Sequence, residues 1–306
     1  MTMQPVRKLA PMTGGAMSYL EWEHKGAPAL HFAHATGFNA QTYQSLLGPL
    51  AGRFHIYASD ARGHGLTALG AARGLASNWT VFRDDLLAFL DDVGGKPMIL
   101  AGHSMGAVVS VLTAIARPHL VRGLVLIEPV LMPQMAWPSA MLRRMMAGRE
   151  APNLAERAAR RRDTFPTIEA AFQAYKGRGA FGTWPDEMLR DYLDGGMALD
   201  TRTEQAHLTC APWWEAETFR GTPQGTSRKA RLLNCPVTIL QGLAGSTASD
   251  GEVQTFVHGH PGTRVIRLPE ASHFLPMEFP DLVREEIHRM ADELRPHLHA
   301  HGIIAA

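Results

Sequence analysis

One serine lies in a context that favours nucleophilic chemistry. The sequence GHSMG at 102–106 follows a short apolar run, 98–101, and precedes the helical pattern AVVSVLTAIARP. A G-x-S-x-G motif at a sharp strand-to-helix turn exposes the serine hydroxyl, and small flanking residues let strand and helix approach closely. A chance match in a glycine-rich chain would explain neither the strand before it nor the helix after it. Ser104 is therefore the candidate nucleophile.

The serine needs a base, because its hydroxyl is a weak nucleophile at neutral pH. For a serine at such a turn, the base follows late in the chain. His273 lies in the loop PEASHFLP, directly after the strand-like segment 263–268. Other downstream histidines lie in or beside helical patterns or in the C-terminal tail: His258, His260, His288, His297, His299 and His301. His273 is therefore the candidate base, and the tail, which lacks a supporting carboxylate or cysteine pattern, is not expected to bind a metal.

Short apolar runs recur along the chain between longer segments with helical spacing. The strand-like runs lie at 29–33, 55–58, 98–101, 124–127, 237–240 and 265–268. Segments such as 79–90 and 107–116 carry apolar residues at the spacing of a helix. Alternating strands and helices indicate a mostly parallel sheet that is covered by helices on both faces. The predicted fold class is α/β.

The pattern changes between residues 133 and 233, where helical segments occur without convincing strands. This stretch is broken at Pro138, Pro152, Pro166, Pro185 and Pro212. Strand signals resume at Pro236. We therefore predict one core domain, residues 1–132 and 234–306, with a helical insertion at 133–233.

These features resemble the α/β-hydrolase superfamily, and a further motif supports the resemblance. The sequence HATGFN at 34–39 follows an early strand and is similar to the oxyanion-hole loop of that superfamily, with Ala35 in place of the usual glycine. The resemblance implies that the backbone N–H groups of Thr36 and Met105 stabilise the anionic oxygen of the tetrahedral intermediate. The sequence DARGHGLT at 60–67 resembles a turn that serves structure in the same superfamily.

The acid of the expected triad departs from the commonest pattern. In many relatives an Asp stands three residues after the glycine that ends the strand at 237–240, but here that position is Gly245. Asp250, farther on, is positioned to begin the next helix, where a carboxylate favours the helix dipole. Some relatives carry the acid after the preceding core strand, where this chain has Glu128, and an idle buried carboxylate would be costly there. We favour Glu128, with Asp250 as the alternative.

The insertion resembles the cap domain of the superfamily, which implies that it covers the active site. It is rich in Met and contains Trp137, Trp184, Trp213 and Trp214. Such side chains suit an adaptable apolar pocket, although helices that pack on each other also need them. We expect the pocket to be lined by Phe38, Trp137, Trp213, Trp214 and Phe274.

Composition excludes several other classes of protein. The chain is 45% hydrophobic with a formal net charge of +1, and so lacks the basic field of a nucleic-acid-binding protein. The run 160–162, three arginines, is expected to be a solvated helix face. Cys210 and Cys235 are too few for a disulfide framework. No segment reads as a signal peptide or approaches the ~20 apolar residues of a membrane span, so we expect a cytoplasmic protein that binds neither membrane nor nucleic acid.

The resemblance implies a serine hydrolase of the carboxylesterase type that needs no cofactor or metal. Ser104 would attack the carbonyl of a small-molecule ester with a short to medium, apolar acyl group, and His273 would transfer the proton. Serine at the turn argues against dehalogenases and epoxide hydrolases, which use Asp there. A lactonase, a thioesterase, a carbon–carbon bond hydrolase and a non-catalytic binding protein of the same fold remain alternatives. The oligomeric state is not readable from the sequence.

Overall fold

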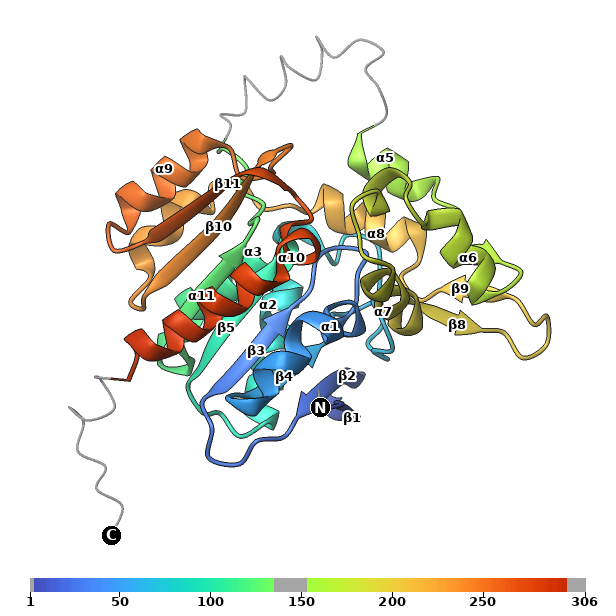
Figure 1. Cartoon of the computed structure of the whole chain (residues 1–306), viewed down its shortest axis with the longest axis horizontal. Helices are drawn as coiled ribbons and strands as arrows, with labels where there is room; N and C mark the ends of the chain where they lie inside the picture. The colour runs from blue at the N-terminus through green and yellow to red at the C-terminus, as the bar shows by residue number, and fades with distance from the viewer. Residues whose placement is uncertain (1–2, 135–152, 296–306) are drawn as a thin grey trace.

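A mostly parallel, eight-stranded sheet forms the centre of the molecule (Figure 1). The computed structural model describes residues 3–134 and 153–295. The strand order is β1-β2-β4-β3-β5-β6-β10-β11, and pairing is antiparallel only for β1 with β2 and for β2 with β4. The strands are β1 (Val6–Met12), β2 (Gly15–Trp22), β3 (Ala29–Ala33), β4 (His55–Ser59), β5 (Met98–His103), β6 (Val121–Ile127), β10 (Val237–Ala244) and β11 (Arg264–Ser272). The predicted α/β class is confirmed.

Helices cover both faces of this sheet because successive residues of each parallel strand point to opposite sides. On β5, Ile99 packs in the apolar layer under one set of helices, and Leu100 packs under the other. The first set is α1 (Gln44–Leu47) and α11 (Pro280–Glu293), and α10 (Leu275–Glu278) precedes α11. The second set is α2 (Thr80–Asp92), α3 (Met105–Ala116) and α9 (Asp250–Gly259). Burial on both faces explains why these strands read as continuous apolar runs.

The antiparallel pair at the N-terminus was not predicted from the sequence. Strand β1, VRKLAPM, is largely exposed at the sheet edge and contains a proline and two basic residues, so it lacks an apolar run. Strand β2 pairs with it through a two-residue turn that contains Gly14, whose φ is 85°. The pattern therefore indicates five buried strands and the edge strand β11 but misses the hairpin that extends the sheet.

Residues 153–220, between β6 and β10, form the group of elements on the right of Figure 1. It contains α5 (Leu154–Ala159), α6 (Ile168–Tyr175), α7 (Asp186–Gly196) and α8 (Pro212–Arg220). Three short strands, β7 (Thr164–Phe165), β8 (Met197–Leu199) and β9 (Ala206–Leu208), pair in the order β7-β9-β8. The expectation of helices without strands was wrong here, because strands of two or three residues are too short to produce an alternating pattern.

Helix α7 of this segment contacts the loop that follows β3. The Asn39 side-chain amide donates a hydrogen bond to the Tyr192 carbonyl at 3.0 Å. The Ser45 backbone N–H donates to the Asp191 carboxylate at 2.9 Å. A Cβ atom on Gly195 would collide with the side chains of Asn39 and Gln41, so the glycine lets the backbone of α7 approach the loop closely. The loop after β3 is therefore fixed from the side of the insertion.

Among the described residues, no helix is long and apolar enough to cross a membrane. Both cysteines, Cys210 and Cys235, are buried and unpaired.

Candidate active site

Ser104 lies at a strained turn between β5 and α3. Its φ of 55° and ψ of −112° are unusual for a residue other than glycine. The turn is possible because its neighbours are small: a Cβ on Gly102 would collide with the backbone of Gly106, and one on Gly106 with the carbonyl of Ala33. The local sequence thus forms the sharp strand-to-helix turn that exposes a serine hydroxyl.

Three residues from distant parts of the chain form a hydrogen-bonded relay. His273 Nε2 lies 3.0 Å from Ser104 Oγ, and His273 Nδ1 lies 3.2 Å from a Glu128 carboxylate oxygen. In this arrangement Ser104 donates its hydroxyl proton to Nε2, and Nδ1–H donates to Glu128. A base held in this tautomer can accept the serine proton as the hydroxyl attacks a carbonyl carbon. The structure therefore brings together the three residues that the sequence analysis proposed as a triad.

Glu128 is fully buried, and hydrogen-bond donors surround its carboxylate. It accepts from the Gly242 backbone N–H at 2.6 Å, from the Ser246 hydroxyl at 2.9 Å and from the Thr247 backbone N–H at 3.2 Å. These charge-assisted bonds offset the cost of burying a carboxylate. The Thr247 hydroxyl also lies 3.2 Å from His273 Nδ1.

Asp250, the alternative acid, lies elsewhere. It begins α9, and its exposed carboxylate accepts from the Gln241 side-chain amide at 3.0 Å. Asp250 therefore has the helix-terminal position that its sequence context indicated.

The two expected oxyanion-hole residues follow the carboxyl ends of the adjacent parallel strands β3 and β5. The Phe38 N–H donates to the Ala35 carbonyl at 3.1 Å, which closes a turn with Gly37 at φ 76°. The hydrogen bond of this turn uses the N–H of Phe38, the last residue of the turn, and does not use the N–H of Thr36. Met105 is the first residue of α3, where backbone N–H groups have no intrahelical acceptor. Both loops thus place backbone donors at the edge of the sheet that carries Ser104.

A buried hydrogen-bond chain that the sequence analysis missed connects these loops. Tyr43 accepts from the Ala35 N–H at 3.2 Å and donates to His103 Nδ1 at 2.8 Å, and His103 Nε2–H donates to the His273 carbonyl at 2.8 Å. Burial lowers the pKa of His103 well below its ordinary 6.5, so the ring is neutral and has one donor and one acceptor. The only sequence signal was the position of His103 inside the G-x-S-x-G motif.

The predicted pocket residues divide into two groups. Phe38 and Phe274 stack at 6.4 Å, and the Phe274 ring lies 5.8 Å from the ring of His273. Trp184, for which no pocket position was predicted, contacts both phenylalanines. These aromatic rings lie beside the candidate base.

The tryptophans of α8 do not join this cluster. Trp214 is buried, and its indole N–H donates to the Arg62 carbonyl at 2.9 Å, in the turn at 60–67. Trp213 is 38% exposed, beside Arg73. Consecutive helical residues point about 100° apart, so α8 directs one indole into the core and the other toward solvent. The structure therefore places neither tryptophan in the aromatic cluster beside His273, and Trp137 lies outside the described residues.

The arginine run at 160–162 follows a helix instead of lying on one; Arg160 and Arg162 are exposed, and Arg161 is half-buried. Helix α5 ends at Ala159, and Arg161 turns inward to pair with Glu215 at 3.2 Å and to donate to the Tyr192 hydroxyl. The Arg161 side chain is 19% exposed, and that of Glu215 is 10% exposed. A Cβ on Gly37 would collide with the Glu215 carboxylate. This ion pair therefore lies against the expected oxyanion loop.

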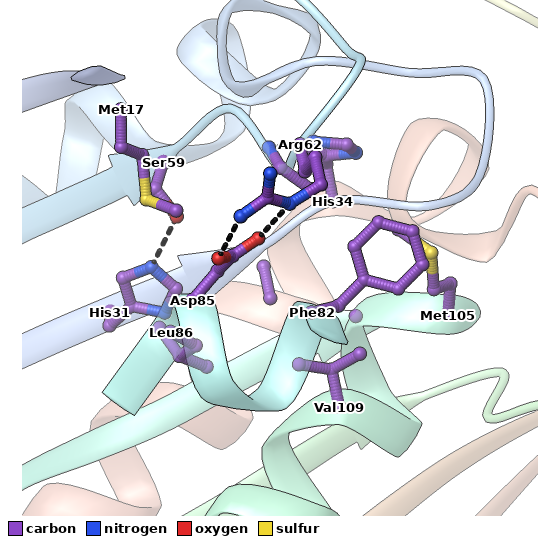
Figure 2. Close-up of a pocket in the computed structure, with 13 residues that line it drawn as sticks. Met17, His31, His34, Ser59, Arg62, Phe82, Asp85, Leu86, Met105 and Val109 are labelled. Carbon is purple, nitrogen blue, oxygen red and sulfur yellow. Dashed lines mark hydrogen bonds and ion pairs between the residues drawn. The ribbon is translucent and has the colours of Figure 1, made fainter. Parts of the chain in front are cut away.

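A small cavity of about 30 Å³ lies on the α2 and α3 side of the sheet, and its lining includes His34 and Met105 (Figure 2). Figure 2 also shows the Arg62 and Asp85 ion pair at 2.7 Å. The cavity has room for about two waters and is not lined by the relay residues, so it is too small and misplaced for an acyl group.

In the described part of the chain, no group of three or more His, Cys, Asp or Glu side chains could hold a metal ion. The tail histidines 297, 299 and 301 lie outside that part.

A family model described as the alpha/beta hydrolase family matches residues 32–286. The chain therefore belongs to the α/β-hydrolase family and has a hydrolytic function.

Individual relatives differ in their reactions. Human monoglyceride lipase is 36% identical over 118 residues, which cover 36% of this chain and only 38% of the lipase. The 2-(acetamidomethylene)succinate hydrolase of Mesorhizobium japonicum is 26% identical over 271 residues, 88% of this chain and 90% of that protein. The crystal structure of an E-2-(acetamidomethylene)succinate hydrolase matches with a TM-score of 0.75 and 22% identity, and the match covers 94% of this chain and 99% of that one. The last likeness supports the fold.

Proposed function

We propose that the protein is a cytoplasmic serine hydrolase of the carboxylesterase type, with Ser104 as nucleophile, His273 as general base and Glu128 as the acid that orients the base. The observation that carries the proposal is the relay from Ser104 Oγ to His273 Nε2 at 3.0 Å and from His273 Nδ1 to Glu128 at 3.2 Å. Nucleophile and base at this separation, with the base held by a third group, are the arrangement that acyl transfer needs.

In the proposed mechanism, His273 accepts the proton of Ser104 as its oxygen attacks the ester carbonyl. Glu128 stabilises the imidazolium that forms. The N–H groups of Thr36 and Met105 donate to the oxyanion, and loss of one such donor costs about 3 kcal/mol in comparable sites. His273 then protonates the leaving alcohol, and water, activated by the same base, releases the acid from Ser104.

The segment 133–233 acts in this proposal as a cap over the site. Its contacts with the loop after β3, and the aromatic cluster of Phe38, Trp184 and Phe274, support this role. Aromatic side chains beside the base favour apolar acyl groups of short to medium length. The lipase likeness agrees with an ester substrate.

A second candidate is hydrolysis of an amide in a substrate with carboxylate groups. The relative from Mesorhizobium japonicum, of which 90% is covered by the match, is named for a substrate that contains an acetamide and a succinate. Arg161, on the insertion and against the oxyanion loop, is a cation that could face such a carboxylate. Glu215 already pairs with Arg161, and for this reason we place the ester first.

Labelling by a fluorophosphonate, followed by peptide mass spectrometry, tests the nucleophile. We expect modification of Ser104 alone and loss of turnover in Ser104→Ala. Ser110 is the matched control, because its hydroxyl donates to the Gly106 carbonyl at 2.8 Å on the same helix and has no base beside it. A label on Ser110 or Ser272, or full activity of Ser104→Ala, would contradict the proposal.

A substrate panel separates the reaction classes. It contains aryl esters of increasing acyl length, lactones, thioesters, a vinylogous diketone and an (acylaminomethylene)succinate. Faster turnover of any other class than of every ester would transfer the assignment to that class.

A further inference from the structure

Trp184 lies between the two loops that carry the proposed oxyanion hole and base. Its indole ring meets Phe38, two residues after Thr36, at 5.2 Å and 84°. It also meets Phe274, the residue after His273, at 5.7 Å and 64°. The side chain of Trp184 thus contacts a neighbour of each catalytic loop.

The position of this tryptophan is fixed by its sequence neighbour. The Thr183 hydroxyl donates to the Glu278 carboxylate at 2.6 Å. The same carboxylate accepts from the Ser272 N–H at 2.7 Å and from its hydroxyl at 2.6 Å. Glu278 therefore links the residue before Trp184 to the residue before His273.

The indole N–H of Trp184 is a buried donor without an acceptor. The residue is only 7% exposed, and its Nε1 atom has no hydrogen-bond partner. The other indoles in the described chain that are this deeply buried are all bonded: Trp22 to Met3, Trp79 to Thr218 and Trp214 to Arg62. Buried donors normally have partners, so this one is available to an acceptor atom that enters beside the catalytic loops.

We infer that the N–H of Trp184 binds a second oxygen of the substrate, a carbonyl or carboxylate oxygen separate from the group that is hydrolysed. The inference rests on the proposed function and narrows its substrate class. The phenylalanines on either side give apolar contact, and the indole supplies the one directional donor among them. A site with such a donor discriminates against an analogue that lacks the oxygen, because the donor then stays unpaired.

The test compares substrates that differ only by this oxygen. In phenyl levulinate a carbonyl replaces one methylene of phenyl valerate, which places the acceptor in the acyl chain. Acetonyl acetate and propyl acetate differ in the same way in the alcohol. We expect the wild-type protein to prefer the oxygen-bearing member of at least one pair. In the Trp184→Phe variant, kcat/KM for that member should fall roughly tenfold, and kcat/KM for the alkyl member should change less than about twofold.

Two further variants separate the N–H from the shape of the ring. Incorporation of 3-benzothienylalanine at position 184 replaces the N–H by sulfur in a ring of nearly the same shape, and it should produce the same loss of preference. Trp213→Phe is the matched control, since this indole is 38% exposed, and it should leave both pairs unchanged. Equal losses on both members of each pair, or a preference retained with benzothienylalanine, would overturn the inference.

A binding measurement decides the matter independently of turnover. Methyl levulinate, methyl valerate and the two acetates are titrated calorimetrically into Ser104→Ala protein, with and without Trp184→Phe. If no ester is hydrolysed, the proposed function fails, while tighter binding of an oxygen-bearing ester that depends on Trp184 still supports the inference. Binding without any preference overturns it.

Discussion

Replacement of Glu128 by Gln changes the hydrogen bonding of the proposed triad while it keeps the side-chain shape. An amide has one acceptor oxygen and one donor NH₂. If the oxygen keeps the bond from the Gly242 N–H, at 2.6 Å, the NH₂ group faces His273 Nδ1. Each orientation sets the NH₂ group against one backbone N–H: that of Thr247, at 3.2 Å, in the first, and that of Gly242, at 2.6 Å, in the second. The second therefore loses the shorter hydrogen bond. We therefore expect the first orientation, in which His273 holds its proton on Nε2 and cannot accept the proton of Ser104.

The magnitude follows from what else can accept the Nδ1 proton. In a comparable triad the wrong tautomer costs about 10⁴ in turnover, or roughly 5.5 kcal/mol. Here the Thr247 hydroxyl lies 3.2 Å from His273 Nδ1 and can accept in place of the carboxylate. We expect Glu128→Gln alone to lower kcat about 10³-fold, and addition of Thr247→Val to lower it about tenfold more.

The assay is steady-state hydrolysis of the best aryl ester, with thermal unfolding to confirm the fold of each variant. Asp250→Asn is the matched control, because this exposed carboxylate lies at the start of α9, and its kcat should change less than about twofold. A folded Glu128→Gln protein with kcat within about tenfold of wild type, or a crippled Asp250→Asn, would refute the reasoning.

Two further predictions concern buried polar groups. Tyr43→Phe removes the hydroxyl that bonds to both Ala35 and His103. We therefore expect denaturant unfolding to show a free energy of unfolding about 3 kcal/mol lower, and the assay to show kcat about tenfold lower. An unchanged free energy of unfolding would contradict these hydrogen bonds. Burial lowers the pKa of His34 to about 4 and that of His64 to about 3, from 6.5, so the unfolded chain binds these protons first as the pH falls. The free energy of unfolding therefore has its full contribution from each neutral ring above pH 6.5. Below that pH the contribution falls by about 1.4 kcal/mol per pH unit, until the pH reaches the folded pKa of the ring. Urea unfolding between about pH 7 and 5 measures this loss, and a free energy of unfolding that does not change over this range would contradict it.

The sequence by itself determined the parts of this protein that depend on local pattern. Five strands appear as apolar runs because both faces of the parallel sheet are covered there: β3, β4, β5, β6 and β10. Ser104 is recognisable because the glycines around it, the strand before and the helix after lie within one short segment. His273 is recognisable because it follows the last strand directly. In each case the structural requirement falls on neighbouring residues.

The position of the proposed acid beside the base required the tertiary structure. The sequence analysis favoured Glu128 over Asp250 from its place after a core strand, but it did not show which carboxylate meets His273. In the sheet, β10 lies between β6 and β11, so Glu128 at the end of β6 reaches across to His273 after β11. The donors around its carboxylate, from Gly242 to Thr247, come from the end of β10 and the loop that follows it. No sequence spacing encodes such a meeting of three strands.

The cap contacts were also decided only by packing. Trp213 and Trp214 are adjacent and identical in type, yet one faces solvent and the other the core, because the helix direction sets which face is covered. Arg161 belongs to a charged run that predicts a solvated surface, but Glu215 and Tyr192, far along the chain, enclose it. The Trp184 N–H lacks an acceptor because none of the residues that surround it places one within reach. Burial and pairing of one side chain depend on residues distant in sequence, and a local pattern does not contain them.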